Sequence, residues 1–429
     1  MRELVKGRLP ESAAASPRED KIDRRREIPP RLERAFGLCY TSGTKPVMER
    51  KMRRMQASKS RFLCVLGIAA ALIASLAVVA ADDFDEGMAA FNAGNFSLAA
   101  EKFEAAAEAV KDDWEPLFWL GLTRLHTGEP ALAEQAFLAV FKLKADIPEA
   151  HNNLGSALLA QGKKEEAEES YKEALRLKPD FADAHYNLGN LYLDKNEPDS
   201  AISHYQEALK TASKNARIHA NLGIAFNKKG ELVKASLALR KAIKLEPKQA
   251  SFHYNLALVL RNARKPAAAI EELRKVVSLD KKDFSAFMLL GSLLHQRKEA
   301  KEAAEAFSAA TALRSDDLAA QHNLARSLVD AGQRKPAEEA FKRALKIAPK
   351  HVALLIDYAA LHMSEEKWVD AEGILLRAVM ANPKSFEAQS NLAIVYGKQG
   401  KFAAAEETWK KLIERYPMGP GPVEGLANL

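Results

Sequence analysis

The sequence has very little cysteine: its 429 residues include two, Cys39 and Cys64, and both precede residue 82. The chain beyond residue 81 therefore has no disulfides, thiolate metal ligands or cysteine nucleophiles. That part also lacks a Gly-rich phosphate loop, a zinc-binding histidine pair on one helix face and a nucleophile elbow. We expect no catalytic residue, no metal, no cofactor and no small-molecule substrate.

Most of the chain also lacks an excess of charge of one sign. Residues 1–81 contain 17 Lys and Arg and 8 Asp and Glu, a net charge of +9. Residues 82–429 contain 47 basic and 49 acidic residues, a net charge of −2. A nearly neutral body gives no electrostatic reason to bind a phosphate backbone, so we expect no nucleic-acid partner.

One long hydrophobic run is present, from Phe62 to Ala81, between a basic stretch and the acidic pair Asp82 and Asp83. This order is typical of a secretory signal, with cleavage after Ala81. Twenty apolar residues also suffice to span a bilayer, so an uncleaved membrane anchor is the alternative. Either arrangement exports the rest of the chain, as a periplasmic or secreted protein or as one anchored in the inner membrane.

These features divide the chain into four parts. Residues 1–54 are a basic, disordered leader or the product of a mis-called start, and residues 55–81 are the signal peptide or anchor. Residues 82–419 form the body. Residues 420–429 are a short tail, whose length and Pro and Gly content predict no additional helix.

A 34-residue repeat runs through the body without an insertion. Ten lines of 34 residues, counted from Ala80, end at Gly419, and position twenty of every line is alanine. Position eight is always Gly or Ala. Small residues let two helices approach closely, so we predict that positions eight and twenty mark the crossing of two helices within each repeat. In the central repeats these crossing residues are Gly155, Gly189, Gly223, Ala167, Ala201 and Ala235.

Large apolar residues at positions seven, eleven and twenty-four surround the small ones at helical spacing. Gly recurs at position fifteen, where it ends the first helix, and Pro at position thirty-two, where it ends the second. The pattern N-L-G-x-x-Y, then A, Y, A-L and P resembles the tetratricopeptide repeat, most closely in residues 148–181 and 182–215. The resemblance implies an all-α fold, a right-handed superhelical solenoid of helix-turn-helix hairpins with a concave binding face.

On that face the resemblance implies that first-helix side chains contact a peptide or protein partner. Position six carries an asparagine row, which can pair with an extended peptide because each amide offers a donor and an acceptor. The predicted contacts are Asn153, Asn187, Asn221, Asn255, Asn323 and Asn391, together with Tyr186, Asn190 and Tyr254. The alternative is that asparagine is simply common at this position of the repeat.

Histidines recur at position four, as His151, His185, His219 and His253. Packed helices lie roughly 8–10 Å apart and equivalent positions are two helices apart, too far for shared metal ligation. We predict that these histidines pack in the core or at the repeat boundaries. The sequence as a whole predicts an exported interaction scaffold, or alternatively a membrane-tethered component of an envelope assembly or polymer-export machine.

Overall fold

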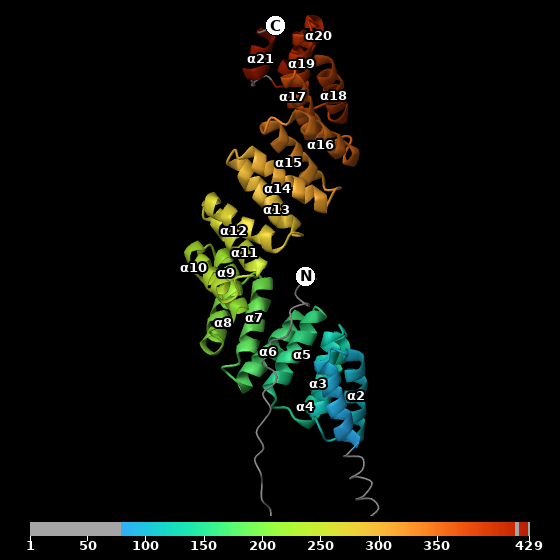
Figure 1. The fold of residues 1–429 in the computed structure, drawn as a ribbon, viewed down its shortest axis with the longest axis vertical. Helices are drawn as coiled ribbons and strands as arrows, with labels where there is room; N and C mark the ends of the chain where they lie inside the picture. The colour runs from blue at the N-terminus through green and yellow to red at the C-terminus, as the bar shows by residue number, and fades with distance from the viewer. Residues whose placement is uncertain (1–78, 417–419, 428–429) are drawn as a thin grey trace, which may run out of the picture. The chain divides into compact units, whose positions relative to one another are not determined.

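The computed structural model describes residues 79–416 and 420–427, and every regular element in these ranges is an α-helix (Figure 1). The predicted all-α fold is confirmed. Residues 79–92 are helical, but the leader, both cysteines and most of the apolar run lie outside the described residues. Within the described ranges, no helix has the length and apolar character needed to cross a membrane.

The helices alternate between a first and a second helix of each repeat. After residues 79–92, the first helices are α3 (Glu115–His126), α5 (Pro148–Ala160), α7 (Ala182–Asp194), α9 (Ala216–Lys229), α11 (Ala250–Asn262), α13 (Phe284–Gln296), α15 (Leu318–Asp330), α17 (Val352–Ser364) and α19 (Phe386–Lys398). The second helices are α2 (Phe96–Ala109), α4 (Pro130–Leu143), α6 (Lys164–Leu177), α8 (Pro198–Thr211), α10 (Leu232–Leu245), α12 (Pro266–Leu279), α14 (Ala300–Leu313), α16 (Arg334–Ile347), α18 (Trp368–Ala381) and α20 (Phe402–Arg415). Each second helix begins 34 residues after the previous one.

The chain divides into two compact units, Met1–Asn187 and Leu188–Leu429, and the division falls inside α7. In the first unit, α3 packs against α2 and α4, and α5 packs against α4 and α6. In the second unit, each helix from α9 to α20 packs against the helix before it and the helix after it. Because each hairpin relies on its neighbours to cover its apolar faces, stability in such a stack is shared between adjacent repeats.

The small residues at positions eight and twenty lie at the helix crossing of each hairpin, next to large buried side chains. All ten alanines at position twenty are completely buried, Ala167, Ala201 and Ala235 among them. A Cβ atom on Gly189 would lie 2.5 Å from the ring of Tyr205, and one on Gly155 would lie 2.6 Å from the ring of Tyr171. The glycines at position eight therefore admit the side chain at position twenty-four of the same hairpin.

Gly223 shows that both small positions meet at one crossing. A Cβ atom there would lie 2.6 Å from Cγ of Leu239, at position twenty-four, and 3.1 Å from the backbone oxygen of Ala235, at position twenty. The backbones of α9 and α10 are thus close enough that any side chain at Gly223 would have to displace the second helix.

Position fifteen adopts the left-handed conformation in all ten repeats. Six of these residues are glycine, with φ between 72° and 84°. The other four are Asn196, Arg264, Lys298 and Glu366, with φ between 56° and 63°. The turn geometry is therefore set by the hairpin, and it persists where the residue has a Cβ atom that disfavours it.

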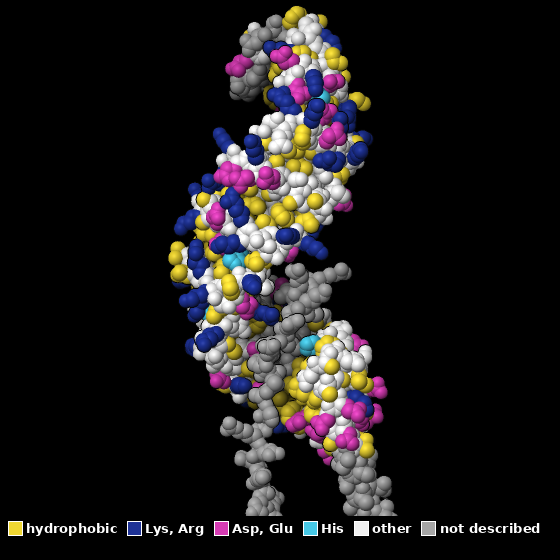
Figure 2. Space-filling model, in the orientation of Figure 1, with side chains coloured by type: hydrophobic (Ala, Val, Ile, Leu, Met, Phe, Trp, Pro, Cys, Tyr) yellow, Lys and Arg dark blue, Asp and Glu magenta, His cyan; other side chains and the backbone are white. Residues whose placement is uncertain are grey.

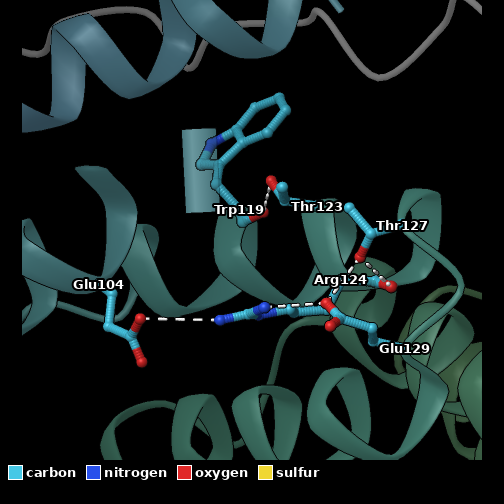
Figure 3. A network of polar contacts seen from close by, with 6 residues as sticks. All are labelled: Glu104, Trp119, Thr123, Arg124, Thr127 and Glu129. Atoms are coloured by element: carbon cyan, nitrogen blue, oxygen red, sulfur yellow. Dashed lines mark hydrogen bonds and ion pairs between the residues drawn. The ribbon is translucent and has the colours of Figure 1, made fainter. Parts of the chain in front are cut away.

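A polar network ties the first hairpins of the first unit together (Figure 3). Arg124 on α3 lies 2.8 Å from Glu129, which precedes α4, and 3.6 Å from Glu104 on α2. The hydroxyl of Thr127 also donates to Glu129, at 2.8 Å. The hydrogen bonds from Arg124 and Thr127 hold the pKa of Glu129 below its usual value. One guanidinium thus connects three successive helices.

The prediction for the tail was wrong, because residues Pro420–Ala427 form a further helix, α21. A Cβ atom on Gly425 would lie 2.5 Å from the indole of Trp409 on α20. Leu426 packs against the same cluster, which contains Ala393 and Leu412. Proline is tolerated in the first turn of a helix, where its missing N–H has no intrahelical partner. The tail therefore covers the last hairpin.

Candidate functional site

The asparagine row occupies the first helices and is only partly accessible. Asn153 is 9% exposed, and the other five side chains are of intermediate exposure. Leu289 and Asp357 replace asparagine in α13 and α17. The asparagine side chains are therefore partly covered by their neighbours. A ligand would have to contact the surface of the first helices closely to reach a side-chain amide.

Two of the six asparagines join neighbouring repeats. In the first unit, Nδ2 of Asn187 donates to Oδ1 of Asn152, at 2.9 Å. In the second unit, Nδ2 of Asn221 donates to Oδ1 of Asn190, at 2.8 Å, and the hydroxyl of Tyr205 donates to the same oxygen, at 2.7 Å. Asn190, which is also a predicted ligand contact, accepts two hydrogen bonds that link α7, α8 and α9. Sequence reasoning missed this role because it depends on the packed register.

The other four asparagines have free amides. The side chains of Asn153, Asn255, Asn323 and Asn391 have no hydrogen-bond partner among the described residues. Each partly accessible amide can donate and accept, as the backbone of an extended peptide requires. The structure therefore separates the row into structural members and members available to a ligand.

The substitution of Asp for Asn in α17 creates a charged contact. His322 Nε2 on α15 lies 2.7 Å from Asp357 Oδ2, and Arg326 Nε lies 3.6 Å from the same oxygen. The His322–Asp357 contact has the same place in the repeat as the Asn187–Asn152 bond. Both join position six of one repeat to position five of the repeat before it. Position six thus links neighbouring repeats at Asn187 and at Asp357.

The two predicted tyrosines differ in their surroundings. Tyr254 on α11 is half-buried, and burial raises the pKa of its hydroxyl, with the charge of Asp283 adding to the effect. Tyr186 on α7 is also half-buried and already has an interaction partner. Tyr254 is next to Asn255 in the chain, so a partly exposed ring accompanies a free amide in this repeat.

The histidine row hydrogen-bonds to the backbone at the repeat boundaries. In each of the four, Nε2 lies 2.9–3.0 Å from the carbonyl oxygen six residues earlier, which belongs to position thirty-two of the preceding repeat. Gln321 and Gln389 make the same bond in later repeats, at 3.1 and 2.8 Å. No group of three or more potential metal ligands occurs among the described residues. Position four therefore satisfies a carbonyl that lacks a helical partner.

His253 also has a hydrogen-bond contact on the other side of its ring. Its Nδ1 lies 2.6 Å from Oε2 of Glu272, which is 8% exposed, and Lys275 bonds the other carboxylate oxygen at 2.9 Å. Burial raises the pKa of Glu272, but the hydrogen bonds and charges of His253 and Lys275 outweigh it, so the pKa lies below its usual value. Both ring nitrogens of His253 lie within hydrogen-bond distance of an acceptor, Oε2 of Glu272 and the carbonyl oxygen of Pro247.

We expect Glu272→Gln to lower the free energy of unfolding by about 1 kcal/mol at pH 7. Because the pKa of Glu272 is lower in the folded state, its stabilising contribution is full above the unfolded pKa and is lost as the pH falls through the folded pKa. Denaturant unfolding of both proteins from pH 7 to pH 3 measures this. Glu271→Gln on the same helix, at an exposed residue, is the control, and a pH-independent difference for Glu272→Gln would contradict the assignment.

Comparison with protein families finds tetratricopeptide repeats along the chain. The model of the Cilia and flagella-associated protein 70 C-terminal domain matches residues 69–348, more than half of the chain. Two further Tetratricopeptide repeat models match residues 328–390 and 387–417. A search of curated proteins finds no match.

Solved structures of similar fold cover about half of the chain. The structure described as functional characterization of pilF of Pseudomonas aeruginosa is 24% identical, with a TM-score of 0.42, and covers 51% of this chain and 97% of its own. A tetratricopeptide repeat protein from Parabacteroides merdae is 18% identical, with a TM-score of 0.45, and covers 58% and 99%. YrrB, described as a TPR protein with an unusual peptide-binding site, is 22% identical, with a TM-score of 0.39, and covers 47% and 100%.

Proposed function

Because this chain belongs to the tetratricopeptide-repeat family of the Cilia and flagella-associated protein 70 C-terminal domain, we propose that it is a non-enzymatic scaffold. It binds a peptide or protein partner on the surface of its first helices. Proteins built from this repeat generally act as non-catalytic interaction scaffolds. The observation that carries the proposal is the set of three free asparagine amides at one repeat position of the second unit, Asn255, Asn323 and Asn391.

The proposed binding of an extended peptide depends on the recurrence of these amides rather than on any single one. The backbone of an extended peptide offers a donor and an acceptor at every residue, and a side-chain amide can pair with both. In α11 the half-buried ring of Tyr254 adds apolar area beside such an amide. Aromatic side chains supply a large share of the binding energy at protein interfaces, so this repeat is the expected centre of the site.

We expect the triple change Asn255→Ala, Asn323→Ala and Asn391→Ala to weaken partner binding at least tenfold while leaving the helical content unchanged. Each lost hydrogen bond costs about 0.5–1.5 kcal/mol. Affinity capture from an extract of the native host, with wild-type and variant proteins side by side, identifies ligands retained only by the wild type. Titration of an identified ligand against both proteins then gives the ratio of affinities.

The matched control is Asn187→Ala with Asn221→Ala, because these amides bond within the protein. This pair is expected to lower stability and to leave binding nearly unchanged. Equal binding by the wild type and the triple variant would contradict the proposal. A loss of helical content in the triple variant would instead assign the free amides a structural role.

The location of the scaffold is part of the proposal and rests on the sequence before Asp82. A basic stretch followed by the run from Phe62 to Ala81 is the arrangement of an export signal. The scaffold would therefore act in the periplasm or outside the cell. The length of the run supports a second candidate, a membrane-tethered component of an envelope assembly or polymer-export machine.

Osmotic-shock fractionation and mass spectrometry of the native protein separate the two candidates. A released protein that begins at Asp82 supports the free exported scaffold. A membrane-bound protein that retains Phe62–Ala81 supports the tethered component. A cytoplasmic protein that retains the whole leader would contradict both.

A further inference from the structure

The near-zero net charge of the body hides a separation of charge between the two compact units. Residues 82–187 contain 21 acidic and 10 basic residues, a net charge of −11. Residues 188–429 contain 28 acidic and 37 basic residues, a net charge of +9. In Figure 2, acidic side chains gather over α2 in the first unit, and Lys and Arg side chains gather over α8–α12 in the second. Each unit therefore presents a field of its own sign.

The basic field is concentrated on the exposed face of α10 and the turn that follows it, which we call the basic face. Its apolar part is Val233 and Leu237, which are 76% and 65% exposed. Its cationic part is Arg240, Lys241, Lys244 and Lys248, all of them exposed. Among the described residues none of these cations has a carboxylate partner, and Arg240 contacts only the hydroxyl of Ser236.

The acidic field includes an exposed face of α2 and its following turn, which we call the acidic face. It consists of Leu98, which is 38% exposed, and of Glu101, Glu108 and Asp112, all exposed. Among the described residues these three carboxylates have no cationic partner. The face is thus a row of acids that begins beside an exposed leucine, as the basic face begins beside Val233 and Leu237.

The charged ends of the two faces share two positions of the repeat. Glu108 and Asp112 occupy positions twenty-nine and thirty-three of the first repeat, and Lys244 and Lys248 occupy the same positions of the fifth. At these two positions, two such helices laid side by side in the same direction would set acid against base. Charges arranged in this way steer association and fix its register.

We propose that the acidic face of one copy of this protein docks on the basic face of a second copy. A second copy is the partner favoured by the structure, because the chain itself carries a face of opposite charge that shares two repeat positions with the basic face. The contact joins two different surfaces, so each copy keeps a free face of each kind, and association is open-ended. The docking surface lies on second helices and is separate from the peptide surface proposed above.

Sedimentation of the full chain in one nonionic detergent buffer tests this. At about 0.05 M salt the mass is expected to rise with concentration beyond a dimer, and at about 1 M salt, where screening is strong, it is expected to fall to that of a monomer. Variant A carries Lys241→Glu, Lys244→Glu and Lys248→Glu. Variant B carries Glu101→Lys, Glu108→Lys and Asp112→Lys. Each alone is expected to associate at least about tenfold more weakly than the wild type.

Mixing the two variants supplies the decisive result. Variant A has two acidic faces and variant B two basic faces, so an equimolar mixture is expected to regain the association that each has lost. The control is Lys301→Glu, Lys335→Glu and Lys398→Glu, which makes the same change of charge at exposed lysines elsewhere and is expected to associate like the wild type. A monomeric wild type at low salt, a mixture that stays monomeric, or equal loss in the control would overturn the proposal.

Discussion

Replacing Tyr205 by alanine is expected to lower the local stability of hairpin α7–α8 by about 3–5 kcal/mol. The ring is completely buried and fills the space left by Gly189, and its hydroxyl donates to Asn190. Removing the ring leaves a cavity that the rigid crossing cannot close, and it leaves Asn190 with one donor fewer. Because a repeat array need not unfold in one step, the measurement is native-state hydrogen exchange of the amides of α7 and α8.

Tyr205→Phe separates the two contributions of this side chain. It keeps the ring against Gly189 and removes only the hydroxyl, so the expected cost is about 0.5–1.5 kcal/mol. An alanine variant no less protected than the phenylalanine variant would show that the ring does not support the crossing.

Replacing Ala235 by leucine is expected to cost about 1–3 kcal/mol. Ala235 is completely buried on α10, and its backbone oxygen lies close to Gly223 on α9. Three additional heavy atoms fit there only if the two helices move apart, which disturbs their contacts with the neighbouring hairpins. Thermal unfolding, together with hydrogen exchange of α9 and α10, measures the loss.

Val233→Leu on the same helix is the matched control. Val233 is 76% exposed, so the larger side chain meets solvent, and the expected change lies within about 0.5 kcal/mol. Equal thermal stability of Ala235→Leu and Val233→Leu would contradict the close crossing of α9 and α10.

The hairpins could be predicted from the sequence because their determinants recur at fixed intervals. A small residue every 34 positions predicts one crossing per repeat, whichever large residues surround it. The left-handed conformation at position fifteen could be predicted from the sequence only where the residue is glycine. Arg264, Lys298 and Glu366 adopt the same conformation, and their residue types give no sign of it. In these repeats the packing of the two helices overrides the local preference of the residue.

The repeat position of the asparagine row could be read from the sequence, but the hydrogen bonds of its members could not. The spacing groups all six asparagines, yet Asn187 and Asn221 bond to neighbouring repeats, and Asn255 does not. The difference depends on whether Asn152 or Asn190 lies within reach, which only the packed register shows. The histidine row is similar, because its acceptor is a backbone carbonyl and has no sequence signature.

The amino-acid composition of the tail gives the wrong prediction of its secondary structure. Prolines and glycines near residue 420 predict irregular structure, yet α21 begins at Pro420. A proline in the first turn lacks only an N–H that the helix does not use. Gly425, which composition counts as a helix breaker, is required because the indole of Trp409 occupies the space beside it. Tertiary contact with α20 decides the structure of this segment.

The central feature of this fold is that small residues at position eight allow the two helices of a hairpin to pack closely. A double-mutant cycle between Gly189 and Tyr205 tests this feature directly. In the wild type, Gly189→Ala is expected to destabilise hairpin α7–α8, because the new Cβ atom would lie 2.5 Å from the ring. In the Tyr205→Ala background the ring is absent, and the same change is expected to stabilise the helix by up to about 1 kcal/mol, the difference in helix propensity. Hydrogen exchange of α7 and α8 in the four proteins gives the result. A reversal of sign is the predicted outcome, and additive effects of the two changes would contradict it.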